Sequence, residues 1–231
     1  MATPHPPRVL VINPNRSEPC SAGIDAAIAP FRFPGGPRLD VVTVAEGPDA
    51  IYSWRDWHAA VEPLCQRIAR ETADVFVIAC ASDPGIEAAR AMTDRPVLGV
   101  FRSAAAMAAA RAEQFGVIAI VDASKGRHLA ALRSMGLENR LTGEIALNVS
   151  METLLQPDLA LAALIESGRS LAAAGAGTVI LGCTGMAHHR GAIEAAIGVP
   201  VIEPCQAAAA LAMGIVLAGT VDRTGARPGE A

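Results

Sequence analysis

The sequence predicts an α/β protein made of two similar halves, each a doubly wound parallel sheet, with an active site in the cleft between them. Three observations predict this fold class. Short segments rich in Val and Ile alternate with Ala-rich segments of helical length along the whole chain. The strand-like segments are apolar throughout, as expected when helices cover both faces of a parallel sheet. The second half of the chain also repeats the pattern of the first.

The expected elements follow one another along the chain. Strands are expected at Arg8–Asn13, Leu39–Val44, Asp74–Ala79, Pro96–Val100, Phe115–Val121, Glu144–Val149, Thr178–Leu181 and Val199–Ile202. Helices are expected between them, at about residues 18–29, 56–72, 85–92, 103–113, 125–135, 157–174, 186–196 and 205–218. The polar tail from Gly219 is rich in Gly and Arg, and we expect it to be frayed.

The repeat is clearest around two cysteines. Ala73-Asp-Val-Phe-Val-Ile-Ala-Cys80 and Gly177-Thr-Val-Ile-Leu-Gly-Cys183 are both strand-like and both end in cysteine. A Pro-Val step follows 16 residues after the first cysteine and 17 after the second. Any two βαβ units look somewhat alike, but a cysteine at the same strand end in both copies favours a true repeat. We expect residues 1–102 with 205–231 to form one half and residues 103–204 the other, related by a pseudo-two-fold axis.

Composition excludes several classes of protein. The formal net charge is −4 at pH 7 and the chain has one Tyr, two Trp and five Phe, so it lacks the basic, aromatic surface of nucleic-acid-binding proteins. Every apolar run is interrupted well before the ~20 residues that a membrane-spanning helix needs. The Pro-rich start lacks the apolar stretch of a secretory signal. We expect a cytoplasmic protein that acts on a small molecule and can assemble into a homo-oligomer.

No cofactor is expected. Lys125 is the single lysine, and it lies in a polar Ser-Lys-Gly-Arg-His stretch without the context of a pyridoxal-phosphate site. Gly-rich phosphate-binding loops are missing from the sequence, and no two cysteines have the C-x-x-C spacing of a zinc site. Chemistry by side chains alone is the simplest interpretation.

The chain has five cysteines, an odd number that argues against a disulfide framework. A small buried hydrophobe is the default interpretation of each, and we apply it to Cys20, Cys65 and Cys205. Cys80 and Cys183 differ because each lies where a strand turns into a helix, at the carboxyl edge of a parallel sheet, where ligands bind. Unpaired N–H groups at a helix start would lower a thiol pKa and hold an anionic oxygen.

Two such cysteines facing one site suit racemisation. One thiolate would remove a proton from a stereocentre, and the opposite thiol would deliver a proton to the other face. The planar intermediate is an enolate, which the helix-end N–H groups would stabilise. We therefore expect Cys80 and Cys183 to be catalytic.

Five segments resemble the hydantoin racemase branch of the aspartate/glutamate racemase superfamily. They are Ile12-Asn-Pro-Asn-Arg-Ser17, Gly47-Pro-Asp-Ala-Ile51, Cys80-Ala-Ser-Asp-Pro-Gly-Ile86, Pro96-Val-Leu-Gly99 and Leu181-Gly-Cys-Thr-Gly-Met186. The matches fall in order over most of residues 8–215. The resemblance implies two α/β domains, no cofactor and a catalytic cysteine pair. It also implies cyclic ureide substrates, such as 5-substituted hydantoins and allantoin.

The sequence departs from the pattern of that branch near the expected substrate. Ala81 stands where a bulky aromatic is common, and Arg16 stands where a Thr is usual. Phe101-Arg102 replaces a small residue followed by Glu. Both cysteines are kept, so the reaction type implied by the resemblance is retained, whereas the substrate is not fixed.

The expected substrate-binding residues cluster around the same strand ends. Their amides, hydroxyls and backbone groups would contact the substrate, although turn formation or helix capping would also explain several of them. The set comprises Asn13, Asn15, Ser17, Ala81, Ser82, Thr184 and Gly185.

Other residues receive plainer interpretations. Asp83-Pro84 is typical of a helix start, with Asp near the N-cap. His188 and His189 are expected on a solvated helix face, although a Cys–His pair is conceivable. Trp54 and Trp57 are expected to form either a lid or a hydrophobic plug.

Alternative functions remain beside the racemase. Within the superfamily they are decarboxylation of substituted malonates, maleate-type isomerisation and amino-acid racemisation. A decarboxylase needs only one cysteine, and an amino-acid racemase needs a site for an ammonium group, for which the sequence has no evident residues. From another class, the chain would be a ligand-binding or redox-sensing protein whose two cysteines form a reversible disulfide.

Overall fold

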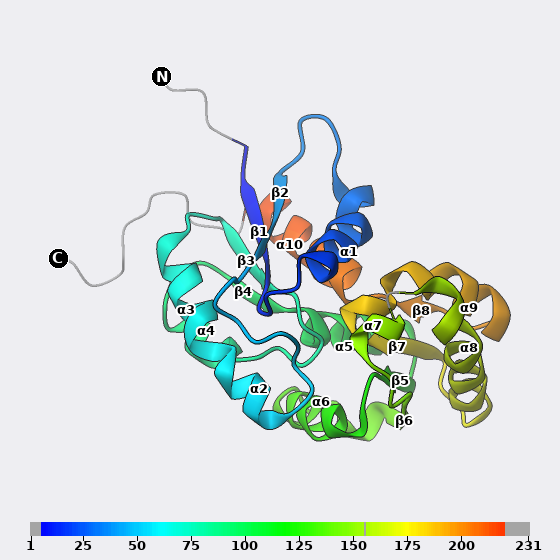
Figure 1. The fold of residues 1–231 in the computed structure, drawn as a ribbon. Helices are drawn as coiled ribbons and strands as arrows, with labels where there is room; N and C mark the ends of the chain where they lie inside the picture. Colours follow the sequence, from blue (N-terminus) through cyan, green and yellow to red (C-terminus); the bar gives the residue numbers. More distant parts are fainter. Residues whose placement is uncertain (1–5, 155, 220–231) are drawn as a thin grey trace.

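The computed structural model describes residues 6–154 and 156–219, which form two four-stranded parallel sheets (Figure 1). The polar tail expected to be frayed lies outside these residues from position 220 on. The first sheet contains β1 (Arg8–Asn13), β2 (Arg38–Thr43), β3 (Val75–Ile78) and β4 (Val97–Gly99). The second contains β5 (Phe115–Ala119), β6 (Leu141–Ala146), β7 (Thr178–Gly182) and β8 (Val201–Ile202).

The two sheets have the same strand order. The first runs β2-β1-β3-β4 and the second β6-β5-β7-β8, and every pairing is parallel. The central strands β1, β3, β5 and β7 are buried almost without exception, because helices cover both of their faces. The predicted fold class, with two equivalent α/β halves, is therefore confirmed.

Helices fill the layers on each side of the sheets. The first half contributes α1 (Glu18–Ile28), α2 (Trp54–Ala59), α3 (Val61–Arg70), α4 (Ile86–Arg90) and the short η1 (Ala29–Phe31). The middle of the chain contributes α5 (Val100–Arg111), α6 (Asp122–Ser134), η2 (Glu138–Arg140), α7 (Met151–Leu154) and α8 (Pro157–Ala173). The last part contributes η3 (Thr184–His189), α9 (Arg190–Ile197) and α10 (Pro204–Leu217).

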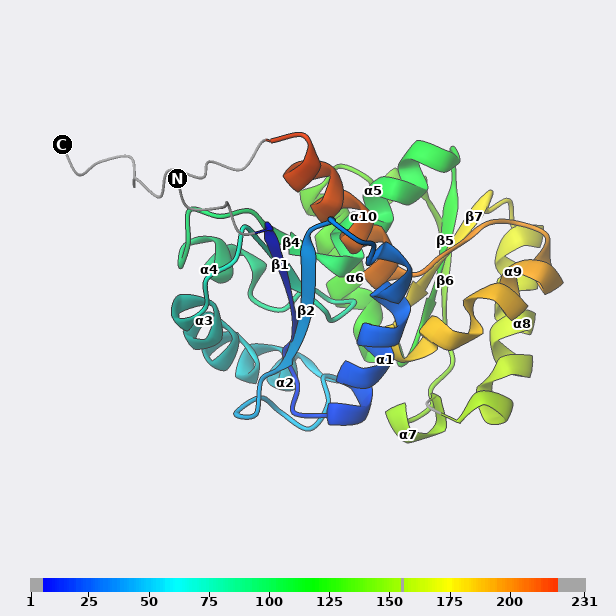
Figure 2. The same cartoon turned by 90° about the horizontal axis from the view of Figure 1, so that it is seen from above.

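Apolar side chains of these helices make four buried clusters. One face of the first sheet packs against α1 and α10, and the other against α3 and α4. One face of the second sheet packs against α8 and α9, and the other against α5 and α6 together with Ala207 of α10. Figure 2 shows α5 and α10 between the two sheets. Because α10 packs on the first sheet, we propose the division into residues 1–102 with 205–231 and residues 103–204.

Some element boundaries differ from the prediction. The strand expected over 144–149 is β6 at Leu141–Ala146, because Leu147 and Val149 continue past the sheet as half-buried loop residues that pack on the core. The expected helix over 186–196 is split into the 3₁₀ turn η3 and α9. The expected helix over 56–72 is likewise split, because α2 ends at Ala59 before α3 begins.

Two buried carboxylates cap the central helices α5 and α10. Glu203, the N-cap residue of α10, accepts hydrogen bonds from the backbone N–H groups of Cys205 and Gln206 at 3.1 and 2.6 Å. The equivalent position before α5 is Gly99, which has no side chain to cap with. Asp83 supplies the carboxylate instead, accepting from the N–H groups of Phe101 and Arg102, each at 2.9 Å.

The Asp83 arrangement corrects the expectation for Asp83-Pro84. Asp83 does not cap the helix that follows it, since α4 begins three residues later at Ile86 with Gly85 as its N-cap residue. Its carboxylate instead caps a helix 17 residues further on, where Gly99 leaves room for it. A Cβ at position 99 would lie 2.2 Å from the Asp83 carboxyl carbon, which is too close for any side chain.

Replacing Glu203 with Gln should change how stability depends on pH. Burial raises the pKa of Glu203 from 4.5 to about 7. A carboxyl with a raised folded-state pKa stabilises the fold most below its unfolded-state pKa, and this contribution is lost as pH rises through the folded-state value. The shift corresponds to about 3 kcal/mol. The free energy of unfolding is measured in urea at pH values from 4.5 to 7. Between these two pH values it should fall by about 3 kcal/mol more in wild type than in Glu203→Gln.

The exposed Glu113 provides a matched control, since its side chain is 96% exposed. Glu113→Gln should leave the pH dependence of the wild type unchanged. A constant difference in unfolding free energy between wild type and Glu203→Gln over this pH range would contradict the assignment.

Candidate active site

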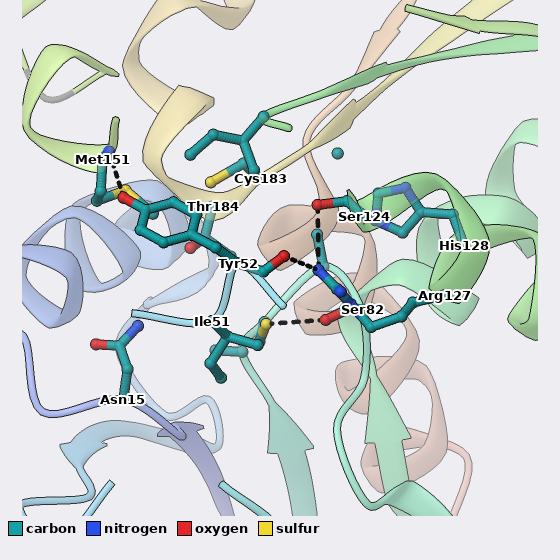
Figure 3. Close-up of a pocket in the computed structure, with 15 residues that line it drawn as sticks. Asn15, Ile51, Tyr52, Ser82, Ser124, Arg127, His128, Met151, Cys183 and Thr184 are labelled. Atoms are coloured by element: carbon teal, nitrogen blue, oxygen red, sulfur yellow. Dashed lines mark hydrogen bonds between the residues drawn. The ribbon is translucent and has the colours of Figure 1, made fainter. Parts of the chain in front are cut away.

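A cavity lies between the two halves and is lined by residues of both (Figure 3). It has an empty volume of about 440 Å³, part of it open to solvent. Its walls come from the ends of β3 and β7, the loop before α2, and the helices α6 and α7. The lining residues are Asn15, Ile51, Tyr52, Ala79, Cys80, Ala81, Ser82, Ile120, Ser124, Arg127, His128, Met151, Gly182, Cys183 and Thr184.

Cys80 and Cys183 both line this cavity, one from each half. Cys80 follows β3 after one residue and is partly exposed, with its Sγ 3.4 Å from the Oγ of Ser82. Cys183 directly follows β7 and is the N-cap residue of the 3₁₀ turn η3. The sequence repeat thus places two thiols at equivalent strand ends beside a shared space.

The electrostatics of the two thiols differ from the expectation. Burial raises the pKa of the Cys183 thiol from 9.0 to about 12, against the opposing effect of the Gly185 backbone N–H. Burial also raises the pKa of Cys80, while the hydrogen bonds of Ser82 and the charge of Arg127 act in the opposite direction. Desolvation therefore outweighs the local N–H groups, and both thiols are protonated at neutral pH.

Local structure explains why the helix-start effect is weak. Cys80 is followed by a turn, and α4 begins only at Ile86 and has five residues. Cys183 is followed by a 3₁₀ turn, whose short run of peptide groups gives a small dipole. Neither cysteine stands at the start of a long α-helix.

Four of the seven residues expected to bind substrate line the cavity: Asn15, Ala81, Ser82 and Thr184. The other three lie behind this layer. The amide of Asn13 donates to Asn15 Oδ1 at 3.1 Å and to Ser21 Oγ at 3.0 Å, which holds Asn15 in place. Ser17 caps α1 by accepting from the N–H of Cys20. Gly185 is close to Met151, whose sulfur would lie 2.6 Å from a Cβ at this position.

Several cavity residues were not predicted from the sequence. Tyr52 accepts a hydrogen bond at its hydroxyl from the backbone N–H of Met151 at 2.7 Å, which links the two halves. Arg127 and His128 project from α6, just over one turn after the helix begins at Asp122. The signal available was that β5 repeats β1, so the helix after β5 also begins at the carboxyl edge of its sheet.

His128 is held rigidly beside the cavity. Its Nδ1 lies 2.5 Å from Oε1 of Glu144, and both side chains are buried. Its ring stacks on Phe101 with centroids 4.3 Å apart. Lys125, from the same polar stretch, instead pairs with Asp122 at 2.6 Å on the surface.

The remaining candidates lie outside the cavity lining. Trp54 is 46% exposed, and the indole N–H of Trp57 donates to the carbonyl of Ser82 at 2.9 Å. His188 is exposed, but His189 is buried, contrary to the expected solvated face, because η3 turns it toward the protein interior.

Two arginines at positions that depart from the hydantoin racemase pattern also lie outside the lining. Arg16 pairs with Asp49 at the surface, and Arg102 pairs with Asp83 and Glu87. The interpretation of Cys20, Cys65 and Cys205 as buried packing residues is confirmed.

The described part of the chain contains no group of three or more His, Cys, Asp or Glu side chains arranged to hold a metal ion. Among residues 6–154 and 156–219, no helix is long and apolar enough to cross a bilayer.

Two equivalent α/β halves that share one cavity, with a cysteine from each half in its wall, form the two-halved fold of racemases of known structure. The chain belongs to the Asp/Glu/Hydantoin racemase family, whose model matches residues 9–212, and it is a racemase. It is 31% identical over 219 residues to the hydantoin racemase of Paenarthrobacter aurescens, an alignment that covers 92% of each chain.

Solved structures agree with this assignment. The allantoin racemase from Klebsiella pneumoniae superposes with a TM-score of 0.85 at 27% identity, covering 95% of this chain and 91% of that one. The allantoin racemase from Pseudomonas fluorescens has the same fold, with a TM-score of 0.84 at 22% identity over 97% of this chain and 99% of that one.

Alkylation of Cys80 should be slow at neutral pH and should accelerate as pH rises past 9, because burial raises its pKa above the ordinary value of 9.0 and only the thiolate reacts. The measurement is the rate of iodoacetamide modification of Cys80 in the native enzyme at a series of pH values, read by peptide mass spectrometry. The urea-unfolded chain is the control and should titrate at the ordinary value. A native rate that already reaches its plateau at neutral pH would contradict the raised pKa.

Proposed function

We propose that this racemase acts on a cyclic ureide, a 5-substituted hydantoin or allantoin, with Cys80 and Cys183 as its acid/base pair and without a cofactor. The observation that carries the proposal is the placement of the two thiols at equivalent strand ends around one cavity. The names of its relatives, hydantoin racemase and allantoin racemase, support the substrate class. The ring carbonyl beside the stereocentre activates the carbon–hydrogen bond, so side chains suffice for the chemistry.

The proposed reaction moves one proton on and one proton off the same carbon. A thiolate on one side takes the proton from the stereocentre, and the electron pair passes to the ring carbonyl to form an enolate. The thiol on the other side then gives its proton to the opposite face of that carbon. Arg127 opposes the effect of burial at Cys80, so Cys80 is the thiol more easily ionised to begin a cycle.

The cavity lining argues against amino-acid racemisation. Among the described residues that line it, none is Asp or Glu, so an α-ammonium group would find no carboxylate partner. A decarboxylase of substituted malonates would need only one of the two thiols, and both are kept here.

A cytoplasmic location is part of the proposal, and the odd number of cysteines, five, supports it because it argues against a disulfide framework. Assembly into a homo-oligomer stays a prediction, which light scattering on the purified protein would test.

Changing either Cys80 or Cys183 to Ser should abolish racemisation, because a serine hydroxyl is too weak an acid to replace a thiol. Each remaining cysteine can still remove and return a proton on its own face. Each single variant should therefore exchange the α-hydrogen of one enantiomer with deuterated water without inverting it, and the two variants should prefer opposite enantiomers. Polarimetry and proton NMR on a 5-substituted hydantoin and on allantoin measure both quantities.

Cys65→Ser is the matched control, because Cys65 is buried in α3 away from the cavity. It should racemise at a rate near that of the wild type. If Cys80→Ser or Cys183→Ser also keeps a near-normal rate on a substrate that the wild type racemises, the two-base assignment is wrong.

Removal of metal ions should leave activity unchanged if side chains alone carry the reaction. The test is exhaustive dialysis against a chelator followed by a polarimetric assay, with the undialysed enzyme as control. Turnover that is lost on dialysis and restored by a divalent metal or by pyridoxal phosphate would overturn the cofactor-free mechanism.

A further inference from the structure

Arg127 is a buried cation without an acidic partner in the cavity wall. Its side chain is 3% exposed and it lines the cavity beside Cys80. Its hydrogen bonds go to uncharged oxygens: the carbonyls of Ala123 and Tyr52 at 3.0 and 3.1 Å, and Ser124 Oγ at 3.2 Å. Its Nε is buried and has no partner among the described residues. Figure 3 shows the guanidinium among Tyr52, Ser124 and Ser82.

The acidic groups closest to Arg127 are already engaged elsewhere. Glu144 is held by His128, and Asp56 caps α2 by accepting from Ser53. Arg127 interacts with both only through space, and its burial lowers its pKa. A guanidinium removed from water without a counter-ion is unfavourable, by several kcal/mol in general. The cavity wall thus holds a positive charge, with no carboxylate in contact with it, next to two protonated thiols.

We propose that Arg127 binds an anionic oxygen that the substrate carries or develops during the reaction. The inference rests on the proposed function and names a group that the substrate must present. The anionic oxygen has two sources: the enolate oxygen that forms when the α-proton leaves, or a carboxylate carried by the substituent at position 5. Either would offer the planar, charge-assisted contact that an arginine fork makes best.

A purely structural role is the alternative. Arg127 ties the loop before α2 to α6 through the Tyr52 carbonyl, and its guanidinium lies 5.8 Å from the ring of Trp54. That loop has other ties, since the hydroxyl of Tyr52 bonds Met151 and the indole of Trp57 bonds Ser82. A neutral hydrogen-bond donor would also hold the loop to α6. A purely structural role therefore does not explain why the Nε of Arg127 is buried without a partner. The two roles differ in whether removing the charge of Arg127 changes KM or kcat while the stability of the fold is unchanged.

The test compares two ring substrates that differ in charge but hardly in shape, hydantoin-5-acetate and hydantoin-5-acetamide. Their kcat and KM are measured by polarimetry for the wild type and for Arg127→Met and Arg127→Lys. Arg133→Met is the matched control, because Arg133 is exposed on the same helix α6. Thermal unfolding of each variant reports on folding.

Each source of the anionic oxygen has its own signature. If the substituent carboxylate is bound, Arg127→Met should raise KM about 10- to 100-fold for the acetate and leave the acetamide within about twofold. If the enolate oxygen is bound, kcat should fall ~100-fold for both substrates with little change in KM. Arg127→Lys, which keeps the charge, should recover part of the loss in either case. Equal rises in KM for both substrates, or no change in either constant, would overturn the inference.

Binding of barbiturate, a planar cyclic ureide that is an anion at neutral pH, separates this inference from the proposed function. Calorimetry should show that Arg127→Met binds it about tenfold or more weakly than wild type and Arg133→Met do. If the wild type racemises neither hydantoin but binds barbiturate in this Arg127-dependent way, the proposed function fails and the anion site stands. Binding that is absent, or equal in wild type and Arg127→Met, together with no turnover, overturns both.

Discussion

The site depends on one constraint, which is that its thiols are desolvated where the two halves of the fold meet. In the order β2-β1-β3-β4, the chain turns in opposite directions from β1 and β3, which opens a crevice beyond their carboxyl ends, and β5 and β7 do the same in the second half. The fold closes these crevices on each other, and Cys80 and Cys183 are largely withdrawn from water. The site that holds the thiols in place therefore also suppresses their ionisation. Compensating charge has to come from the cavity wall, where Arg127 is placed, or from the occupant.

The sequence predicts those parts of the arrangement that depend on short, local patterns of residues. Each central strand is a largely apolar run, so the strands and the correspondence between the two halves could be inferred from the sequence. The cysteines were identifiable because they occupy the same place in both copies of that pattern. Asn15 and Thr184 followed from the same reasoning, since each lies directly beyond a strand end.

The parts that the sequence does not predict depend on contacts between distant segments. Tyr52 belongs to the site because its loop crosses to the second half and meets Met151, 99 residues away. In the sequence, Arg127 is indistinguishable from the other charged residues of a polar helix. It is buried because the loop that contains Tyr52 covers α6, which the sequence does not predict. His189 is internal because η3 is a 3₁₀ turn, a distinction that hydrophobic periodicity cannot make.

The capping of α5 and α10 bears on how the two halves diverged. In the second copy, the N-cap residue Glu203 caps its own helix, α10. In the first copy, the N-cap residue of α5 is a glycine, and the distant Asp83 supplies the capping carboxylate. Single substitutions cannot convert one arrangement into the other without a destabilised intermediate. The first substitution leaves the helix end either with two carboxylates in the same buried space or with no capping carboxylate. Among related sequences, positions 83 and 99 should therefore vary together, with glycine at 99 wherever 83 is acidic.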